Sequence, residues 1–327
     1  MKRCYLGIDV GSVSTNIIVM DEGHEILDSQ YIRTQGRPVE AIKHGLLQIK
    51  DRWQDTIKIM GVGTTGSGRQ LGGKMVGSDV IKNEITAHGI ASLHYMSSVK
   101  TIIEIGGQDS KIILLRDGII YDFAMNTVCA AGTGSFLDRQ AERLGVPIEE
   151  FGDMALKSKA PVRIAGRCAV FAESDMIHKQ QLGHNQEDII NGLCEALVRN
   201  YINNLGKGKA IEAPVMFQGG VAANIGIRKA FEKILNCEVN VPPHANVMGA
   251  IGSALLAKDE VSNKGYTNFV GLNMADCDYA IKGFECSSCS NMCEVVQFYR
   301  DDHLIARWGD KCGRWSNIAN AITEKFA

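Results

Sequence analysis

Two single cysteines, Cys129 and Cys168, stand at the start of segments with helical character. Cys129 precedes Ala-Ala-Gly-Thr-Gly-Ser and an amphipathic stretch, while Cys168 lies in Gly-Arg-Cys-Ala-Val-Phe. The first turn of a helix offers unpaired N–H groups and a partial positive charge, which favour a thiolate or an anionic thiolate-bound cluster. A free cysteine is more often a small buried hydrophobic residue. The repeated arrangement, in a chain that also carries a nucleotide-binding pattern, favours the chemical role.

A second group of cysteines lies near the C-terminus, in the order Cys286-x2-Cys289-x3-Cys293 and then Cys312. Between Cys293 and Cys312 the residues alternate like a hairpin that turns at Asp301-Asp302. Thiolates at such spacing are typical ligands of zinc. The sequence therefore predicts a small tetrathiolate module that holds Zn²⁺ or a second [4Fe–4S] cluster, and the spacing does not decide between the two.

An acid-and-glycine pattern near the N-terminus is typical of phosphate binding. The segment 5–9 predicts a strand that ends in Asp9, and a turn at 11–15 leads into a returning strand. Backbone N–H groups and hydroxyls of such a turn can bind a phosphate, and Asp9 can hold Mg²⁺ through water. The pattern from Ile8 to Gly23 recurs at a constant offset of 95 residues (103 − 8).

Two such hairpins facing each other across a cleft could clamp both ends of a triphosphate. Chance similarity is the alternative, because acid-glycine hairpins are common. A third glycine turn, 219–224, lies between a predicted strand and a helix and suits the nucleoside side of a nucleotide. Glu84 and His88 share a helical face, where a hydrogen-bonded pair is favoured over a metal site. The residues expected to bind the nucleotide are Gly11, Ser12, Ser14, Thr15, Gly106, Gly107, Lys111, Gly219, Gly220 and Asn224.

Composition limits the classes of function. The 327 residues are 45% hydrophobic, which is enough for two domains, and a net charge of −2 gives no sign of a nucleic-acid or membrane partner. No apolar run approaches a membrane span, so the ten cysteines are expected to be thiols or metal ligands in the reducing cytoplasm. We expect a first half at 1–98, a second half with the cluster cysteines at 99–259, and a Cys-rich tail module at 260–327.

Several of these motifs resemble known families. The segments 9–15, 104–110 and 219–224 are similar to the phosphate and adenosine motifs of the acetate and sugar kinase, Hsc70 and actin superfamily. The motif from Asn126 to Phe136, together with Cys168-x-Val-Phe-Ala-Glu-Ser, resembles a narrower group. That group comprises the ATP-dependent activators, or reductase components, of 2-hydroxyacyl-CoA dehydratases and of benzoyl-CoA reductase.

The resemblance covers roughly residues 5–258 and carries several implications. It implies an α/β fold of duplicated ribonuclease-H-like, actin-like ATPase domains around a nucleotide cleft, with the Cys-rich module added at the C-terminus. It implies a homodimer with one [4Fe–4S] cluster between the subunits, to which each subunit contributes Cys129 and Cys168. It also implies ATP-driven electron transfer in anaerobic metabolism, from a small donor such as ferredoxin or flavodoxin to a partner iron–sulfur enzyme. That partner would be a 2-hydroxyacyl-CoA dehydratase-like enzyme or a double-cubane-cluster protein.

Within this reading, Gln108 is the candidate for positioning the attacking water, and Asp9 and Asp109 are candidates for the magnesium shell. Two other functions fit the same fold: a small-molecule kinase, and an ATP-switched binding protein without redox chemistry. A kinase gives no reason for Cys129 and Cys168 at helix starts.

Overall fold

The computed structural model describes residues 1–316, which form two compact units. Unit 1 contains Met1–Gly11, Thr15–Lys82 and the chain from Ser253 onward, and unit 2 contains Ser12–Ser14 and Asn83–Gly252. No helix within residues 1–316 is long and apolar enough to cross a membrane.

These units differ from the boundaries expected at 98 and 259. Helix α3 (Glu84–Tyr95) belongs to unit 2, where it packs against strand β8 (Ile119–Asn126), although it lies before residue 98. Helix α9 (Met248–Lys264) begins in unit 2 and continues into unit 1. Residues 317–327 of the expected tail module lie outside the described residues.

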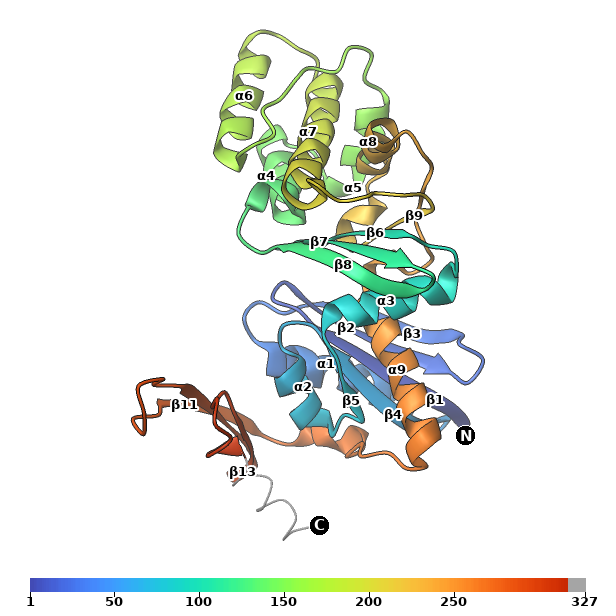
Figure 1. Cartoon of the computed structure of the whole chain (residues 1–327), viewed down its shortest axis with the longest axis vertical. Helices are drawn as coiled ribbons and strands as arrows, with labels where there is room; N and C mark the ends of the chain where they lie inside the picture. The colour runs from blue at the N-terminus through green and yellow to red at the C-terminus, as the bar shows by residue number, and fades with distance from the viewer. Residues whose placement is uncertain (317–327) are drawn as a thin grey trace. The chain divides into compact units, whose positions relative to one another are not determined.

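Unit 1 is built on a five-stranded sheet in the order β3-β2-β1-β4-β5 (Figure 1). One face of β1 carries apolar residues that pack with those of the helices α1 and α2. On the other face, α9 approaches β4 closely: a Cβ at Gly61 would lie 2.8 Å from the Val261 side chain, and one at Gly63 would collide with the Ser253 carbonyl. The elements are β1 (Lys2–Val10), β2 (Ser14–Asp21), β3 (Ile26–Arg33), α1 (Pro38–Trp53), β4 (Ile57–Thr65), α2 (Arg69–Val76) and β5 (Val80–Ile81).

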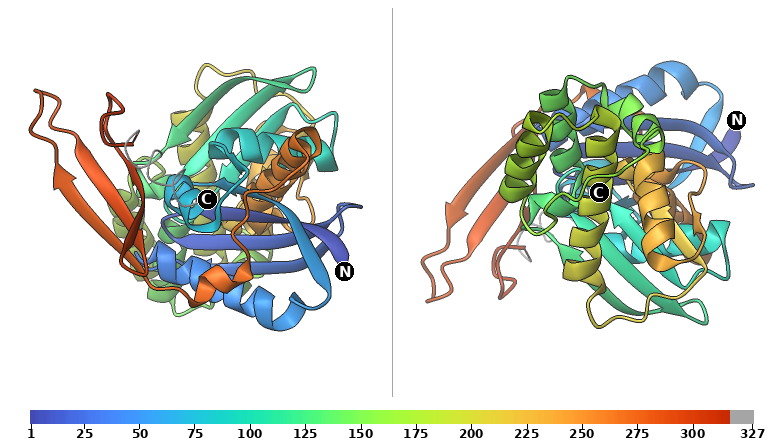
Figure 2. Two further views of the ribbon diagram at one scale, coloured as in Figure 1. Left: turned by 90° about the horizontal axis from the view of Figure 1, so that it is seen from below. Right: turned by 90° about the horizontal axis from the view of Figure 1, so that it is seen from above.

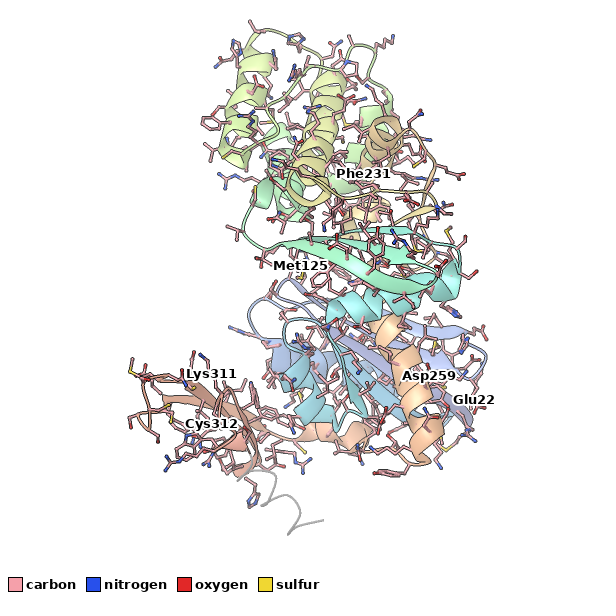
Figure 3. All side chains as sticks on the ribbon, in the orientation of Figure 1. Glu22, Met125, Phe231, Asp259, Lys311 and Cys312 are labelled. Atoms are coloured by element: carbon pink, nitrogen blue, oxygen red, sulfur yellow. The ribbon has the colours of Figure 1, made fainter. Side chains whose placement is uncertain are left out.

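Unit 2 contains a second five-stranded sheet, in the order β10-β9-β6-β7-β8, with a layer of helices on one face (Figure 1). Phe231, labelled in Figure 3, lies in this layer with its ring 5.3 Å from those of Tyr201 and Phe217. The elements are β6 (Thr101–Ile105), β7 (Ser110–Arg116), α4 (Gly134–Leu144), α5 (Ile148–Leu156), α6 (Ala169–Gln181), α7 (Gln186–Tyr201), β9 (Val215–Gln218), α8 (Ile225–Leu235) and β10 (Val239–Asn240). Shorter helical segments of unit 2 are η1 (Ala130–Gly132), η2 (Ile202–Gly206), η3 (Gly220–Ala223) and η4 (Ala245–Val247), whereas η5 (Leu272–Asp276) belongs to unit 1.

The two sheets have the same strand order, which confirms the internal repeat. Strands β3-β2-β1-β4-β5 correspond in turn to β8-β7-β6-β9-β10. Asp9 pairs with Asn16 across β1 and β2, and Glu104 pairs with Lys111 across β6 and β7. Both members of the second pair lie 95 residues after those of the first (104 − 9 and 111 − 16). The repeat is therefore structural, and not a chance similarity of two hairpins.

The C-terminal part forms a separate three-stranded antiparallel sheet (Figure 2). It consists of β11 (Tyr279–Glu285), β12 (Glu294–Arg300) and β13 (His303–Trp308). The hairpin predicted around Asp301-Asp302 is confirmed as β12 and β13, and β11 is an additional strand. Lys50 of α1 pairs with Asp276 of η5 at 2.6 Å, which links the segment before β11 to α1 within unit 1.

Candidate functional site

Both cysteines of the central motifs occupy helix N-cap positions, as the sequence predicts. Cys129 caps η1, which leads into α4, and Cys168 caps α6. Each has extended backbone angles, and neither side chain is itself used to cap the helix. Both residues are partly exposed, so their thiols remain accessible.

Two asparagine side chains hold the cysteine segments in place. Asn126 donates to the Cys129 carbonyl at 2.8 Å and accepts from the Cys129 N–H at 2.9 Å. Asn200 of α7 is buried, and its Nδ2 lies 2.7 Å from the Gly166 carbonyl oxygen and 4.0 Å from the Cys129 sulfur. Because one amide group contacts both segments, Cys129 and the approach to Cys168 are tied to the same point of unit 2.

The helices that follow the cysteines are joined by ion pairs. Glu173 of α6 accepts from Arg139 at 3.1 Å and pairs with Arg143 at 2.8 Å, both from α4. A groove of about 620 Å³ lies between these helices, lined by Ala130, Ser135, Phe136, Asp138, Arg139, Gln140, Glu142, Ala169, Val170 and Glu173. The start of each cysteine helix therefore borders one groove.

Exposed apolar side chains flank both cysteines. Val128 is 95% exposed, Val170 is 68% exposed and Phe171 is 67% exposed. Each lies within three residues of Cys129 or Cys168. Isolated exposed hydrophobic residues are common, but three beside two accessible thiols form a surface suited to being covered.

The predicted phosphate loop contacts the start of α4 directly. The Gly134 N–H donates to the Gly106 carbonyl at 2.9 Å, and the Ser135 N–H donates to the Gly107 carbonyl at 2.9 Å. The Ser135 hydroxyl also donates to the Gly107 carbonyl, at 2.6 Å. Helix α4, which follows Cys129 and η1, is thus bonded to two of the glycines expected to bind nucleotide.

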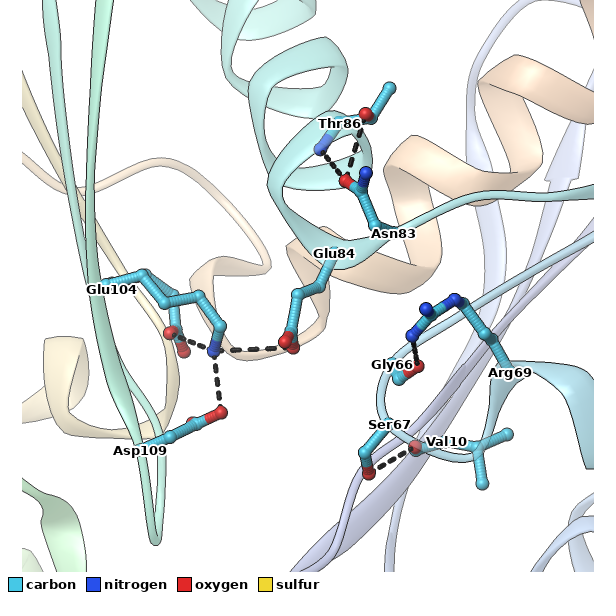
Figure 4. Close-up of polar contacts among 10 residues, drawn as sticks. Val10, Gly66, Ser67, Arg69, Asn83, Glu84, Thr86, Glu104 and Asp109 are labelled. Atoms are coloured by element: carbon cyan, nitrogen blue, oxygen red, sulfur yellow. Dashed lines mark hydrogen bonds and ion pairs between the residues drawn. The ribbon is translucent and has the colours of Figure 1, made fainter. Parts of the chain in front are cut away.

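A buried charge cluster lies behind this loop (Figure 4). Lys111, whose side chain is only 3% exposed, has its ammonium 2.9 Å from Glu104, 3.0 Å from Asp109 and 3.4 Å from Glu84. Burial raises the pKa of Glu104 to about 7, although the Lys111 ammonium opposes this shift. Burial opposes protonation of Lys111, but the surrounding carboxylates outweigh it and raise the pKa of Lys111. Lys111 therefore acts as an internal counter-ion, which favours a supporting role over the predicted contact with nucleotide.

The other predicted nucleotide residues fall into two groups. At the third glycine turn, 219–224, Gly219 adopts a φ of +90° and a Cβ there would lie 2.7 Å from Glu104. Asn224 caps α8 by accepting from the Ile227 N–H at 3.1 Å. These contacts bring the turn beside the charge cluster, and a role for Asn224 or the neighbouring Gly220 in nucleotide binding stays a prediction.

In the first hairpin, the residues predicted to bind nucleotide differ in their burial. Thr15 is fully buried and its Oγ1 lies 3.0 Å from that of Thr34, so its hydroxyl is used within unit 1. Ser12 is exposed, and Gly11 and Ser14 are partly exposed. Of the predicted catalytic residues, Gln108 is exposed and Asp109 is bonded to Lys111. The catalytic roles of Asp9, Gln108 and Asp109 stay predictions.

The tail cysteines are not gathered into a finished metal site. Cys286 is buried, Cys293 is partly exposed, and Cys289 and Cys312 are exposed. Across residues 1–316, no group of three or more His, Cys, Asp or Glu side chains is arranged so that it could hold a metal ion. Glu84 pairs with the Lys111 ammonium at 3.4 Å, and His88 is buried with Lys111 nearby.

Sequence reasoning missed three contributors to the site. Asn200 lies 71 residues after Cys129, and nothing local to it indicates the contact. Glu173 and Ser135 stand inside the two cysteine motifs, but their partners are distant in the chain. Asn126, in contrast, begins the motif that contains Cys129. Its spacing of three residues from Cys129 is typical of a side chain that fixes a turn.

Known proteins resemble this chain over most of its length. Residues 6–257 match the model of the BadF/BadG/BcrA/BcrD ATPase family. The (R)-2-hydroxyglutaryl-CoA dehydratase activating ATPase of Acidaminococcus fermentans is 35% identical over 257 residues, covering 77% of this chain and 96% of the relative. The 2-hydroxyisocaproyl-CoA dehydratase activator of Clostridioides difficile is 34% identical, covering 78% of this chain and 95% of the relative.

The structure agrees with these sequence matches. A solved activator of the 2-hydroxyisocaproyl-CoA dehydratase from Clostridium difficile, with bound ADPNP, superimposes with a TM-score of 0.72 at 31% identity. The match covers 82% of this chain and 100% of the other. Strands β11 to β13 lie beyond the family match, which ends at residue 257. The chain has the actin-like ATPase fold of two α/β sheet units and belongs to the BadF/BadG/BcrA/BcrD ATPase family.

Proposed function

We propose that this protein uses ATP hydrolysis to drive low-potential electron transfer from a [4Fe–4S] cluster, shared by two copies of the chain, to a partner iron–sulfur enzyme. The partner would be a 2-hydroxyacyl-CoA dehydratase-like enzyme or a double-cubane-cluster protein. Relatives at 35% and 34% identity are named as activators of 2-hydroxyacyl-CoA dehydratases, which supports this class of partner. A small donor such as ferredoxin or flavodoxin would supply the electron in the cytoplasm.

The observation that carries the proposal is the pairing of two accessible N-cap thiols. Asn200 contacts the Cys129 sulfur and bonds the Gly166 carbonyl, two residues before Cys168, and exposed apolar residues stand beside each cysteine. Thiolates at helix starts are stabilised by the N–H groups and the partial positive charge there. A bound cluster would supply one-electron chemistry at low potential.

The number of thiols supports a shared cluster. A [4Fe–4S] cluster needs about four thiolates, and each chain offers two here. Cys194 is no substitute, because it is fully buried and burial raises the pKa of its thiol to about 12. A two-fold axis through the site would present the same two thiolates twice. The apolar residues beside the cysteines would then be covered by the second copy.

ATP binding is supported by the ATPase family and by the ADPNP bound to the similar activator structure. The glycine loop at Gly106 and Gly107 would contact phosphate through backbone N–H groups. Asp9 and Asp109 would hold Mg²⁺, whose charge would stabilise the triphosphate, and Gln108 would orient the attacking water. The bonds from Gly134 and Ser135 to this loop would pass its movement to the segment that carries Cys129. Membership in an ATPase family, together with the paired thiols, favours this function over the kinase.

Two variants test the two halves of the proposal in protein purified without oxygen. Asp9→Ala should lose ATP hydrolysis but keep the visible cluster absorbance, because Asp9 belongs to unit 1 whereas both cysteines belong to unit 2. Cys168→Ser should lose the cluster absorbance, whereas the control Cys237→Ser should keep it. A Cys168→Ser protein with undiminished cluster absorbance, or an Asp9→Ala protein with normal turnover, would contradict the corresponding half.

A further inference from the structure

The four cysteines of the tail lie in two loops at the same end of the three-stranded sheet. Glu285, the last residue of β11, pairs with Glu294, the first of β12, so the loop containing three cysteines leaves and re-enters the sheet there. Val296 of β12 pairs with Trp308, the last residue of β13, so the segment containing Cys312 starts at this end too. The Cys286 N–H donates to the Cys293 carbonyl at 2.8 Å, which closes the first loop.

Trp315 joins the second loop to the first. Its indole N–H donates to the Cys286 sulfur at 3.3 Å, and its ring packs edge-on against Phe284 at 5.0 Å. An N–H donor to sulfur is the kind of outer contact that supports metal-bound thiolates.

Few apolar side chains of the sheet are buried, and most of these belong to the core of unit 1. The buried apolar side chains of its strands are Val295, Phe298 and Ala306. Phe298 and Ala306 lie in the same hydrophobic cluster as Leu6 and Ile8 of β1, whereas the described residues of the two cysteine loops supply no side chain to this cluster. A bound metal would stabilise these loops. Lys311 and Cys312, labelled in Figure 3, are adjacent, and Arg307 and Arg314 lie over the Trp315 ring.

We propose that Cys286, Cys289, Cys293 and Cys312 bind one zinc-class metal ion that joins the two loops. The gaps of two and three residues in the first loop match the short ligand spacing of structural zinc sites. The four sulfur atoms are not grouped for ligation in the structure. Ligation would draw the loops together, since metal sites commonly form as the metal binds. This site lies beyond the family match and is independent of the proposed ATP and cluster chemistry.

Metal analysis of the full-length protein tests the site. The protein, purified without oxygen and without a metal-binding tag, should carry about one zinc per chain. The double variant Cys289→Ser/Cys312→Ser should lose zinc and keep its iron. The control Cys277→Ser alters a cysteine that precedes β11 at the opposite end of the sheet, and it should keep both metals. Zinc retained by the double variant, or iron lost from it, would overturn the proposal, and the second result would indicate an iron–sulfur cluster in the tail.

Two conservative tryptophan variants distinguish a direct effect on the metal site from loss of metal through misfolding. Trp315→Phe keeps an aromatic ring but removes the N–H donor to Cys286, and should weaken zinc affinity by about 10–100-fold. Trp308→Phe alters a tryptophan whose ring packs on Phe298, and it should leave the affinity unchanged. Competition with a chelator of known affinity measures both. Cobalt(II) bound in place of zinc should show the absorption of a tetrahedral thiolate site in both tryptophan variants and in the original protein. Absence of this absorption from the original protein would overturn the proposal.

Discussion

The Ser135 hydroxyl donates to the Gly107 carbonyl at 2.6 Å, and this contact joins the predicted phosphate loop to the helix that follows Cys129. The Gly134 N–H adds a parallel bond to the Gly106 carbonyl at 2.9 Å. Both bonds lie within unit 2 and need no rearrangement of the chain to connect the two segments. The loop that would respond to nucleotide is therefore mechanically continuous with a cysteine segment.

Removing the Ser135 hydroxyl should weaken this connection. Ser135→Ala should keep ATP hydrolysis within a few-fold of the original rate but reduce the effect of nucleotide on the rate at which a chelator removes iron. Ser174→Ala is the control, because the Ser174 hydroxyl bonds only to the Val170 carbonyl of its own helix at 3.0 Å. An unchanged nucleotide effect in Ser135→Ala would remove the hydroxyl from the coupling.

The ion cluster around Lys111 should contribute strongly to the stability of unit 2. Lys111→Met leaves the buried Glu104 carboxylate without its counter-ion and should lower the free energy of unfolding by about 3–5 kcal/mol. Lys100→Met, which breaks the exposed pair with Glu212, should cost less than about 1 kcal/mol. Urea unfolding measures both, and adding Glu104→Gln to Lys111→Met should recover part of the loss. Equal costs for the two lysine variants would contradict the counter-ion role.

His88 should make stability sensitive to acid. Burial, together with the Lys111 ammonium, lowers the pKa of His88 from 6.5 to about 3. Below pH 6.5 the unfolded chain binds a proton that the folded chain does not, so stability falls as pH falls, by up to about 1.4 kcal/mol per pH unit. Glu104 has the opposite effect on the dependence of stability on pH, because burial raises its pKa to about 7. This effect is expected in the protein with His88 and in a variant without it.

The comparison with His88→Asn isolates this effect. Urea unfolding of the original protein and of the variant between pH 5 and pH 6.5 should show the steeper loss of stability only in the original protein. Parallel stability curves would mean that His88 is protonated in the folded protein.

Asn200 should matter for the cysteine site beyond its contribution to stability. Asn200→Leu removes the amide that bonds the Gly166 carbonyl and contacts the Cys129 sulfur, so it should lower stability by about 1–3 kcal/mol and reduce iron content. Asn191→Leu, on the same helix, removes a bond to the Ala155 carbonyl and should cost similar stability with full iron content. Iron analysis and unfolding of both variants separate the two effects. Full iron in Asn200→Leu would show that the amide is not needed to hold the thiols.

Local sequence patterns predict the helix starts and the repeat that form the site. Contacts between residues far apart in the chain cannot be read from these patterns. The helix starts after Cys129 and Cys168, and the repeat that relates Asp9 to Glu104, could be read from sequence because each depends on neighbouring residues. The contact of Asn200 with Cys129 depends on how α7 packs in unit 2, and no periodicity encodes it. The buried state of Lys111 also escaped prediction, since a lysine beside a glycine loop is more simply read as a phosphate ligand.

The domain boundaries are less predictable from sequence, because they also depend on contacts between distant residues. Helix α3 lies before residue 98 in the sequence, but its packing against β8 and the pair of Glu84 with Lys111 place it in unit 2. Helix α9 runs through the expected end at 259 to Lys264, and Val261 packs against β4 where Gly61 has no side chain.

The central claim is that two chains share one cluster through Cys129 and Cys168, and iron content measured with molecular mass tests it most directly. Full-length protein purified without oxygen should hold about two irons per chain and have the mass of a dimer. Cys129→Ser should remove the iron from both subunits and weaken the dimer. About four irons per chain in a monomer, or full iron in Cys129→Ser, would contradict the account.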